Sequence, residues 1–157
     1  MLEIKKLTKN FAIKYTEEIL SLEKNWREIG DVPWRVDNLL MELELKWELS
    51  HVSIYNKKIA GYQIGSLKEG SAFLNKIVVD KEARNLSIGK KLLKKFLESC
   101  LQKNLDNLRF RVRTDNPAVA FYDKLGFKRK AELDYTRTDK IPSYFYDILI
   151  KDAIKNF

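Results

Sequence analysis

The chain has 157 residues, of which 45% are apolar or aromatic. This length and composition suit one domain with a hydrophobic core, over residues 1–157, and would be cramped for two. Apolar runs such as residues 148–150 are far shorter than the roughly 20 residues that span a bilayer, so no membrane helix is predicted. Lys and Arg number 30 against 22 Asp and Glu, a formal net charge of +8 that favours anionic partners.

The basic excess has three interpretations. The lysines are distributed along the whole chain, which favours a simple solvated surface. A site for a phosphorylated cofactor is the second interpretation. Nucleic-acid binding is the third and is not expected, because no helix-turn-helix, zinc-finger or aromatic RNP pattern appears.

The N-terminus and the cysteine content predict a cytoplasmic location. Residues 1–7 alternate between apolar and polar side chains and lack the apolar stretch and cleavage site of a secretory signal. Cys100 is the only cysteine and falls on the inner face of a helix, so a buried, unpaired thiol is expected. No metal site is expected, because the only histidine, His51, lies far from Cys100 and is interpreted as a turn or surface residue.

In chain order, the apolar spacing of the N-terminal part predicts a strand followed by two helices. Residues 2–7 have the alternation of a strand, and residues 11–27 carry apolar side chains at helical spacing. Residues 30–33 break this helix, and a second helix is expected from about Arg35 to Glu48.

The rest of the chain predicts mainly strands, with a helix from Ile88 to Leu101 and a short one that Asn116 caps. The apolar run at residues 77–79 suits a central strand that is buried on both faces. The expected strands after residue 7 are 52–55, 59–67, 72–79, 108–112, 127–135 and 143–150.

The loop at residues 80–87 has the composition of an anion site, although an ordinary strand-to-helix turn would look similar. It precedes a helix N-terminus, where free backbone N–H groups and a partial positive charge attract anions. The side chains that suit an anion are the cations of Arg84, Lys90 and Lys91, the hydroxyl of Ser87 and the missing side chain of Gly89.

A second motif covers residues 116–127. Asn116 and Pro117 are good starting residues for a short helix, and Gly126 suits its end. Helix capping explains these three residues, but it does not explain Tyr122.

Together, residues 72–127 resemble the acetyl-CoA-binding core of the GNAT N-acetyltransferase superfamily. The resemblance implies an α+β fold, with a central mixed, mostly antiparallel sheet of about seven strands and about four flanking helices. It is carried by Val78-Val79-Asp80 before Arg84, Ser87 and Gly89, and by Asn116 and Tyr122 before Leu125-Gly126-Phe127.

The resemblance also implies which residues bind acetyl-CoA. Asn116 would contact the pantetheine arm, and Tyr122 would lie near the sulfur atom. The backbone of Ile77, Val78 and Val79 would meet the same arm. The pyrophosphate would be surrounded by Arg84, Asn85, Ser87, Ile88, Gly89 and Lys90.

The reaction implied is direct attack of a primary amine on the thioester of acetyl-CoA. An N–H group of the central strand, at Val79, would polarise the thioester carbonyl, and Tyr122 is the candidate acid for the departing thiolate. The alternative for Tyr122 is a core tyrosine. Two positions depart from the family pattern: Ser87 replaces a usual glycine, and the central strand reads Asn75-Lys76-Ile77, where many relatives place a glutamate base. No base is therefore assigned.

The sequence leaves the acceptor amine and the oligomeric state undecided. The segment from Glu23 to Leu40, with Pro33-Trp34, loosely resembles ribosomal-protein N-terminal acetyltransferases, which implies the α-amine of a protein N-terminus as acceptor. A protein lysine is also considered. Small amines such as polyamines or aminoglycosides are the alternative. Trp34 is a candidate for the acceptor cleft, whereas Trp26 and Trp47 are expected in the core. A homodimer and a CoA-binding domain without catalysis are further alternatives.

Overall fold

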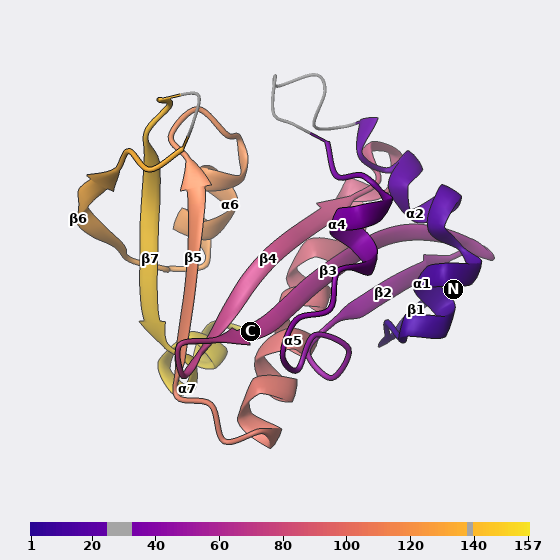
Figure 1. Cartoon of the computed structure of the whole chain (residues 1–157), viewed down its shortest axis with the longest axis horizontal. Helices are drawn as coiled ribbons and strands as arrows, with labels where there is room; N and C mark the ends of the chain where they lie inside the picture. Colours follow the sequence, from indigo (N-terminus) through magenta and orange to yellow (C-terminus); the bar gives the residue numbers. More distant parts are fainter. Residues whose placement is uncertain (25–32, 138–139) are drawn as a thin grey trace.

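A single sheet is the central element of the computed structural model, which describes residues 1–24, 33–137 and 140–157. Within these residues, seven strands pair in the order β1-β2-β3-β4-β5-β7-β6 (Figure 1). Neighbouring strands are antiparallel except β4 and β5, so the expected mixed sheet and α+β class are confirmed. The strands are β1 (Leu2–Lys6), β2 (His51–Tyr55), β3 (Lys58–Lys68), β4 (Ser71–Val79), β5 (Asn107–Arg113), β6 (Arg129–Asp134) and β7 (Ser143–Leu149).

The central strands β4 and β5 diverge soon after they meet. They are in register only at Ala72 with Leu108 and at Phe73 with Arg109, and beyond these pairs the two strands separate (Figure 1). On its other side, β4 carries an extra residue at Asn75, where the register with β3 shifts. A bulge of this kind bends a strand. The sheet therefore opens between its two parallel strands.

Helices cover both faces of the sheet around β3. The ring of Tyr62 packs with residues of the N-terminal helices, whereas Gly61 and Gly65 face α5. A Cβ atom on Gly65 would lie only 2.4 Å from Cε1 of Phe96, so glycine allows α5 to approach closely. The helical segments are α1 (Lys9–Lys14), α2 (Thr16–Ser21), α4 (Val36–Leu40), η1 (Lys81–Leu86), α5 (Ile88–Gln102), α6 (Ala118–Lys124), α7 (Ile150–Ala153) and η2 (Ile154–Asn156).

The helix expected over residues 11–27 is two short helices in the structure. Thr8 caps α1, because its Oγ1 accepts a hydrogen bond from Phe11 N at 3.1 Å. At Tyr15 the backbone leaves the helical region, with φ −113° and ψ 29°, and α2 begins at the next residue. Residues 25–27 of the expected helix, Trp26 included, and most of the expected break at 30–33 lie outside the described residues.

The expectation of one helix from Arg35 to Glu48 is wrong beyond Leu40. Met41 adopts φ −55° and ψ 130°, which ends α4. The chain then folds back so that Lys46 Nζ donates hydrogen bonds of 2.6 Å to the carbonyl oxygens of Leu39 and Met41. A buried ammonium thus occupies the carbonyl end of α4, a favourable place for a cation, and the apolar residues that suggested a longer helix belong to a loop.

The end of the chain also differs from the expectation. The last strand ends at Leu149, and residues 150–156 form α7 and η2. The expected loop at 80–87 contains η1, on which Ala83 is buried. The described residues hold six α-helices where about four were expected, but none of these is long and apolar enough to cross a membrane.

Candidate active site

A cavity of about 680 Å³ lies where β4 faces the starts of α5 and α6, and we call it the α5 cavity. Its volume is in the range of small-molecule and cofactor sites. Nine of the residues assigned to acetyl-CoA binding from the sequence line it: Ile77, Val78, Val79, Arg84, Ser87, Gly89, Lys90, Asn116 and Tyr122.

Two assigned residues do not line the α5 cavity. Asn85 is exposed on η1. Ile88 is fully buried, in a cluster with Ala60, Ala83 and Leu92, so its side chain belongs to the core and only its backbone N–H group can serve an anion at the helix start.

The junction of η1 and α5 forms the basic end of the cavity. Ser87 adopts φ 56° and ψ 30°, the left-handed region, directly before α5. A Cβ atom costs roughly 1–2 kcal/mol in that region, which is a physical reason for the glycine that the family resemblance leads us to expect at this position. Lys91 N–H makes the first helical bond, to Ser87 O at 3.0 Å, so the three preceding N–H groups have no helical partner. Arg84 and Lys90 add charge on the same wall.

On β4, Val79 turns its N–H group toward the opening. Asp80 N donates to Ala60 O of β3 at 2.7 Å, and Val79 is in register with Gly61. Successive N–H groups along a strand point to opposite sides, so the N–H group of Val79 points away from β3 and toward the side where β5 diverges. This is the direction that a donor to a thioester carbonyl would need.

The α6 motif positions Asn116 and Tyr122. Asn116 Oδ1 accepts a hydrogen bond from Ala118 N at 2.8 Å, which fixes the start of α6. Tyr122 is only 3% exposed and packs 4.8 Å from the ring of Phe110. Burial, and secondarily the neighbouring Tyr146, raise the pKa of Tyr122, so its hydroxyl keeps its proton at neutral pH. Tyr122 is thus a core residue that also lines the cavity.

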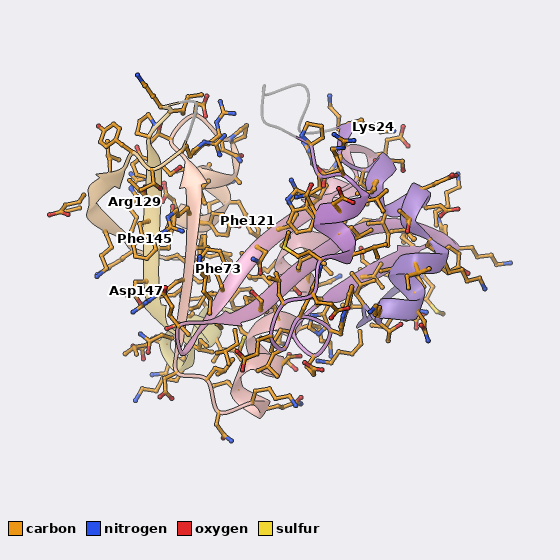
Figure 2. All side chains as sticks on the ribbon, viewed as in Figure 1. Lys24, Phe73, Phe121, Arg129, Phe145 and Asp147 are labelled. Atoms are coloured by element: carbon orange, nitrogen blue, oxygen red, sulfur yellow. The ribbon has the colours of Figure 1, made fainter. Side chains whose placement is uncertain are left out.

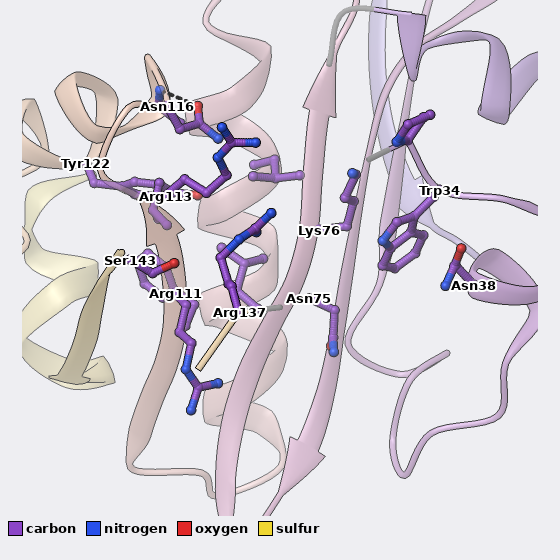
Figure 3. Close-up of a pocket in the computed structure, with 16 residues that line it drawn as sticks. Trp34, Asn38, Asn75, Lys76, Arg111, Arg113, Asn116, Tyr122, Arg137 and Ser143 are labelled. Atoms are coloured by element: carbon purple, nitrogen blue, oxygen red, sulfur yellow. Dashed lines mark hydrogen bonds between the residues drawn. The ribbon is translucent and has the colours of Figure 1, made fainter. Parts of the chain in front are cut away.

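A second cavity, of about 450 Å³, meets the first at Tyr122, and we call it the Trp34 cleft. Ile77, Asn116 and Ala118 also line both cavities. Figure 3 shows Trp34 and Lys76 on the side of β4, and arginine side chains on the side of β5. Trp34 therefore lies in a cleft, as considered from the sequence, whereas Trp47 packs at the edge of the core.

Glu23, a residue without an assigned role in the sequence, is a buried carboxylate beside the Trp34 cleft. It accepts hydrogen bonds from the Tyr62 hydroxyl and from Trp34 N, the latter at 3.1 Å. Its Oε2 also lies 3.1 Å from Lys76 Nζ. No local motif marks Glu23, since these partners come from distant parts of the chain.

The arginines of the Trp34 cleft were also missed, although the sequence holds a signal for them. On β5, Arg111 and Arg113 alternate with Phe110 and Val112, and this alternation predicts a cationic face on that strand. The third arginine, Arg137, comes from the connection between β6 and β7.

His51 is buried, and its expected place at a turn or on the surface is wrong. It lies on β2, where Nδ1 is 2.9 Å from Gln63 Oε1 and Nε2 is 3.2 Å from Ser99 Oγ. Cys100, in contrast, is buried and unpaired as expected, and burial raises the pKa of its thiol to about 12. Neither residue lines the two cavities.

The fold and cavities agree with a match to a known family. A family model described as "Acetyltransferase (GNAT) domain" matches residues 36–139, more than half of the chain. The chain therefore belongs to the GNAT acetyltransferase family, and its class of protein is an acetyltransferase enzyme. A comparison with curated proteins gives no match.

Solved structures of several acetyltransferases share the fold. The ribosomal-protein-S18-alanine N-acetyltransferase from Escherichia coli is 22% identical, with a TM-score of 0.74, over 96% of this chain and 94% of that one. A GNAT acetyltransferase from Staphylococcus aureus Mu50 is 26% identical, with a TM-score of 0.73, over 96% and 99%. PaiA N-acetyltransferase from Thermoplasma acidophilum, solved with coenzyme A, is 18% identical, with a TM-score of 0.69, over 94% and 99%.

Proposed function

We propose that this enzyme is a single acetyltransferase domain, located in the cytoplasm, that moves an acetyl group from acetyl-CoA to a primary amine by direct attack on the thioester. The observation that carries the proposal is the meeting of two cavities at Tyr122. The α5 cavity has a basic end at a helix N-terminus, and the Trp34 cleft offers a second reactant a separate path to Tyr122.

The α5 cavity fits acetyl-CoA. The N-terminus of α5, with Arg84 and Lys90, suits the pyrophosphate, and the divergence of β4 from β5 leaves room for the pantetheine arm beside residues 77–79. Bound acetyl-CoA supplies the thioester, whose carbonyl oxygen would accept a hydrogen bond from Val79 N–H. No metal is part of this proposal.

Tyr122 would donate its hydroxyl to the leaving sulfur. Its raised pKa keeps the proton on the Tyr122 hydroxyl at neutral pH. A free thiol has a pKa of about 8.5, so complete proton transfer from the phenol alone to the thiolate is unfavourable. The protons balance overall, because the attacking neutral amine loses one proton when it becomes an amide and the leaving sulfur takes up one. Tyr122 therefore acts as the hydrogen-bond donor through which that proton reaches the sulfur.

Two measurements test the proposed function. Calorimetry should detect coenzyme A binding, and thiol release from acetyl-CoA should accelerate with at least one amine from a panel of N-terminal peptides, lysine peptides and small amines. Binding without thiol release would identify a CoA-binding domain without catalysis. Absence of both, together with tight and salt-dependent binding to duplex DNA, would favour nucleic-acid binding instead.

A further inference from the structure

The segment after β7 packs against both helices that wall the α5 cavity. Its helix α7 is anchored in the core, because Ile150 and Ala153 are buried. The helical turn η2 follows directly, and from there Asn156 contacts the end of α6 and Phe157 the start of α5. Neither Asn156 nor Phe157 lines either cavity. The segment therefore borders the proposed cofactor site without being part of it.

The α5 cavity lies between the start of α5 and the end of α6. Lys90 lines it from the first turn of α5, and Leu125 lines it at the end of α6. Phe121 of α6, which lies on the side of that helix toward β4 (Figure 2), lines the cavity as well. Residues that contact Lys90 and Leu125 from outside the cavity can therefore set the positions of both walls.

Asn156 binds the end of α6. Its Nδ2 donates a hydrogen bond of 2.8 Å to the carbonyl oxygen of Leu125, and carbonyl groups at a helix end lack a partner within the helix. The next residue, Gly126, has φ 77° and leaves room for this approach, since a Cβ atom there would lie 3.4 Å from Asn156 Nδ2. Asn156 thus ties the segment to α6.

The ring of Phe157 contacts α5. Lys90 Nζ lies 5.9 Å from the centroid of this ring, within the range of a cation–π interaction, in which the negative face of an aromatic ring attracts a cation. The ring of Phe127, a core residue, has its centroid 6.4 Å from that of Phe157. The Phe157 ring is therefore supported by the core and offers the ammonium group of Lys90 a fixed partner.

This contact restricts Lys90 without removing it from the cavity, because Lys90 lines the cavity in the same arrangement. Lys90 is otherwise exposed, and an exposed lysine side chain loses much rotamer freedom when it binds a phosphate group. A side chain that is already restricted loses less, and the ligand binds more tightly as a result.

We propose that Phe157 is a positioning residue of the cofactor site, which preorganises Lys90 for the pyrophosphate of coenzyme A. The inference rests on the proposed function, since it requires coenzyme A to occupy the α5 cavity. Asn156 holds the segment at α6, and Phe157 acts through Lys90. This role concerns affinity for the cofactor and not the chemical step.

Phe157→Leu tests the inference, because leucine keeps an apolar side chain against the core and removes the ring. We expect calorimetry to show coenzyme A binding weakened by about two- to fivefold, the range of an exposed cation–π interaction. The KM for acetyl-CoA should rise by a similar factor while kcat stays the same. Phe157→Tyr keeps the ring and should bind coenzyme A like the wild type. Unchanged or tighter binding by Phe157→Leu overturns the inference.

A double-mutant cycle with Lys90→Gln shows whether the ring acts through Lys90. Without the ammonium group the ring has no cation to hold, so Phe157→Leu should cause no further loss of affinity in the Lys90→Gln background. An equal loss in both backgrounds would mean that the ring supports the site by packing alone, which overturns the inference. Melting temperatures ensure that every variant is folded at the temperature of the binding measurement.

Phe11→Leu is the matched control, because Lys5 Nζ lies 4.8 Å from the centroid of the Phe11 ring and neither residue lines a cavity. The control should bind coenzyme A like the wild type. A loss equal to that of Phe157→Leu would show a general effect of removing such a ring and would also overturn the inference.

Failure of the inference and failure of the proposed function give different results. Equal coenzyme A binding by the wild type and Phe157→Leu overturns only the inference. If the wild type binds no coenzyme A, the proposed function and the inference both fail. Coenzyme A binding without thiol release contradicts only the catalytic part of the proposed function, and the double-mutant cycle then decides the inference in the same way.

Discussion

Gly89, in the first turn of α5, faces the ring of Phe121 on α6, so that a Cβ atom on Gly89 would lie 3.5 Å from Cζ of that ring. It would also lie 3.6 Å from Cγ2 of Val79. Both distances are ordinary van der Waals contacts. The protein itself can therefore accept a methyl group at this position, which lines the α5 cavity.

Gly89→Ala should affect coenzyme A binding in the α5 cavity without destabilising the fold. Alanine is about 1 kcal/mol better than glycine within a helix, so the free energy of unfolding should be unchanged or rise by up to that amount. The added methyl group would occupy space where the cofactor's phosphates are proposed to approach the backbone, so coenzyme A affinity should fall about tenfold or more. Thermal unfolding and calorimetry measure the two effects. A stable variant with full affinity would place the phosphates elsewhere.

Arg84→Ala should weaken binding of acetyl-CoA by roughly ten- to a hundredfold, because a charge-assisted hydrogen bond is worth about 1.5–3 kcal/mol. Lys94→Ala is a suitable control, since Lys94 is an exposed cation on α5 that does not line the cavity. Calorimetry of both variants decides the assignment. Equal affinity for Arg84→Ala and the wild type would remove Arg84 from the site.

We expect the free energy of unfolding to depend on pH through His51. Burial, with smaller effects from Lys6 and Lys95, lowers the pKa of His51 from 6.5 to about 4 in the folded protein. Between these values the unfolded chain binds the additional proton, so the free energy of unfolding falls as the pH drops from about 6.5 to 4. The total loss is about 3 kcal/mol.

Comparison with His51→Gln isolates this effect. Glutamine does not titrate, so the difference in unfolding free energy between wild type and variant should shrink by about 3 kcal/mol over this pH range. Denaturant unfolding at several pH values measures it. A constant difference from pH 7 to 4 would mean that His51 takes up its proton equally well in both states.

Local patterns explain which parts of the fold and the site were predictable. The turn residues before β3, the alternation within β5 and the capping residues around α6 act over a few neighbours, so sequence alone finds these elements. The η1–α5 loop was found for the same reason, since its cations and Gly89 lie next to a helix start.

The missed features depend on side-chain contacts that no local pattern of the sequence indicates. The end of α4 at Leu40 depends on Lys46 reaching back to carbonyl oxygens, and the apolar spacing of residues 35–48 contains no sign of that reach. Glu23 gains its role only when β3 and β4 bring Tyr62 and Lys76 to it. His51 alternates correctly for a strand, but its burial comes from packing against α5, whose Ser99 Oγ lies 3.2 Å from His51 Nε2.

Tyr122→Phe separates an enzyme from a binding domain. The change keeps the aromatic ring that packs on Phe110 and removes only the hydroxyl group. The melting temperature and the affinity for acetyl-CoA should therefore stay close to those of the wild type. General acid assistance is typically worth about 10²- to 10⁴-fold, so kcat should fall within that range when chemistry limits turnover.

Tyr146→Phe is the matched control for this experiment. The two rings have centroids 5.6 Å apart in the same cluster, and Tyr146 is fully buried but lines neither cavity. Removing its hydroxyl should leave kcat unchanged, which distinguishes loss of a proton donor from disturbance of the aromatic cluster. A pre-steady-state burst measurement first establishes that chemistry is rate-limiting. If Tyr122→Phe then turns over at the wild-type rate, Tyr122 serves only the core, and water or another group delivers the proton to the sulfur.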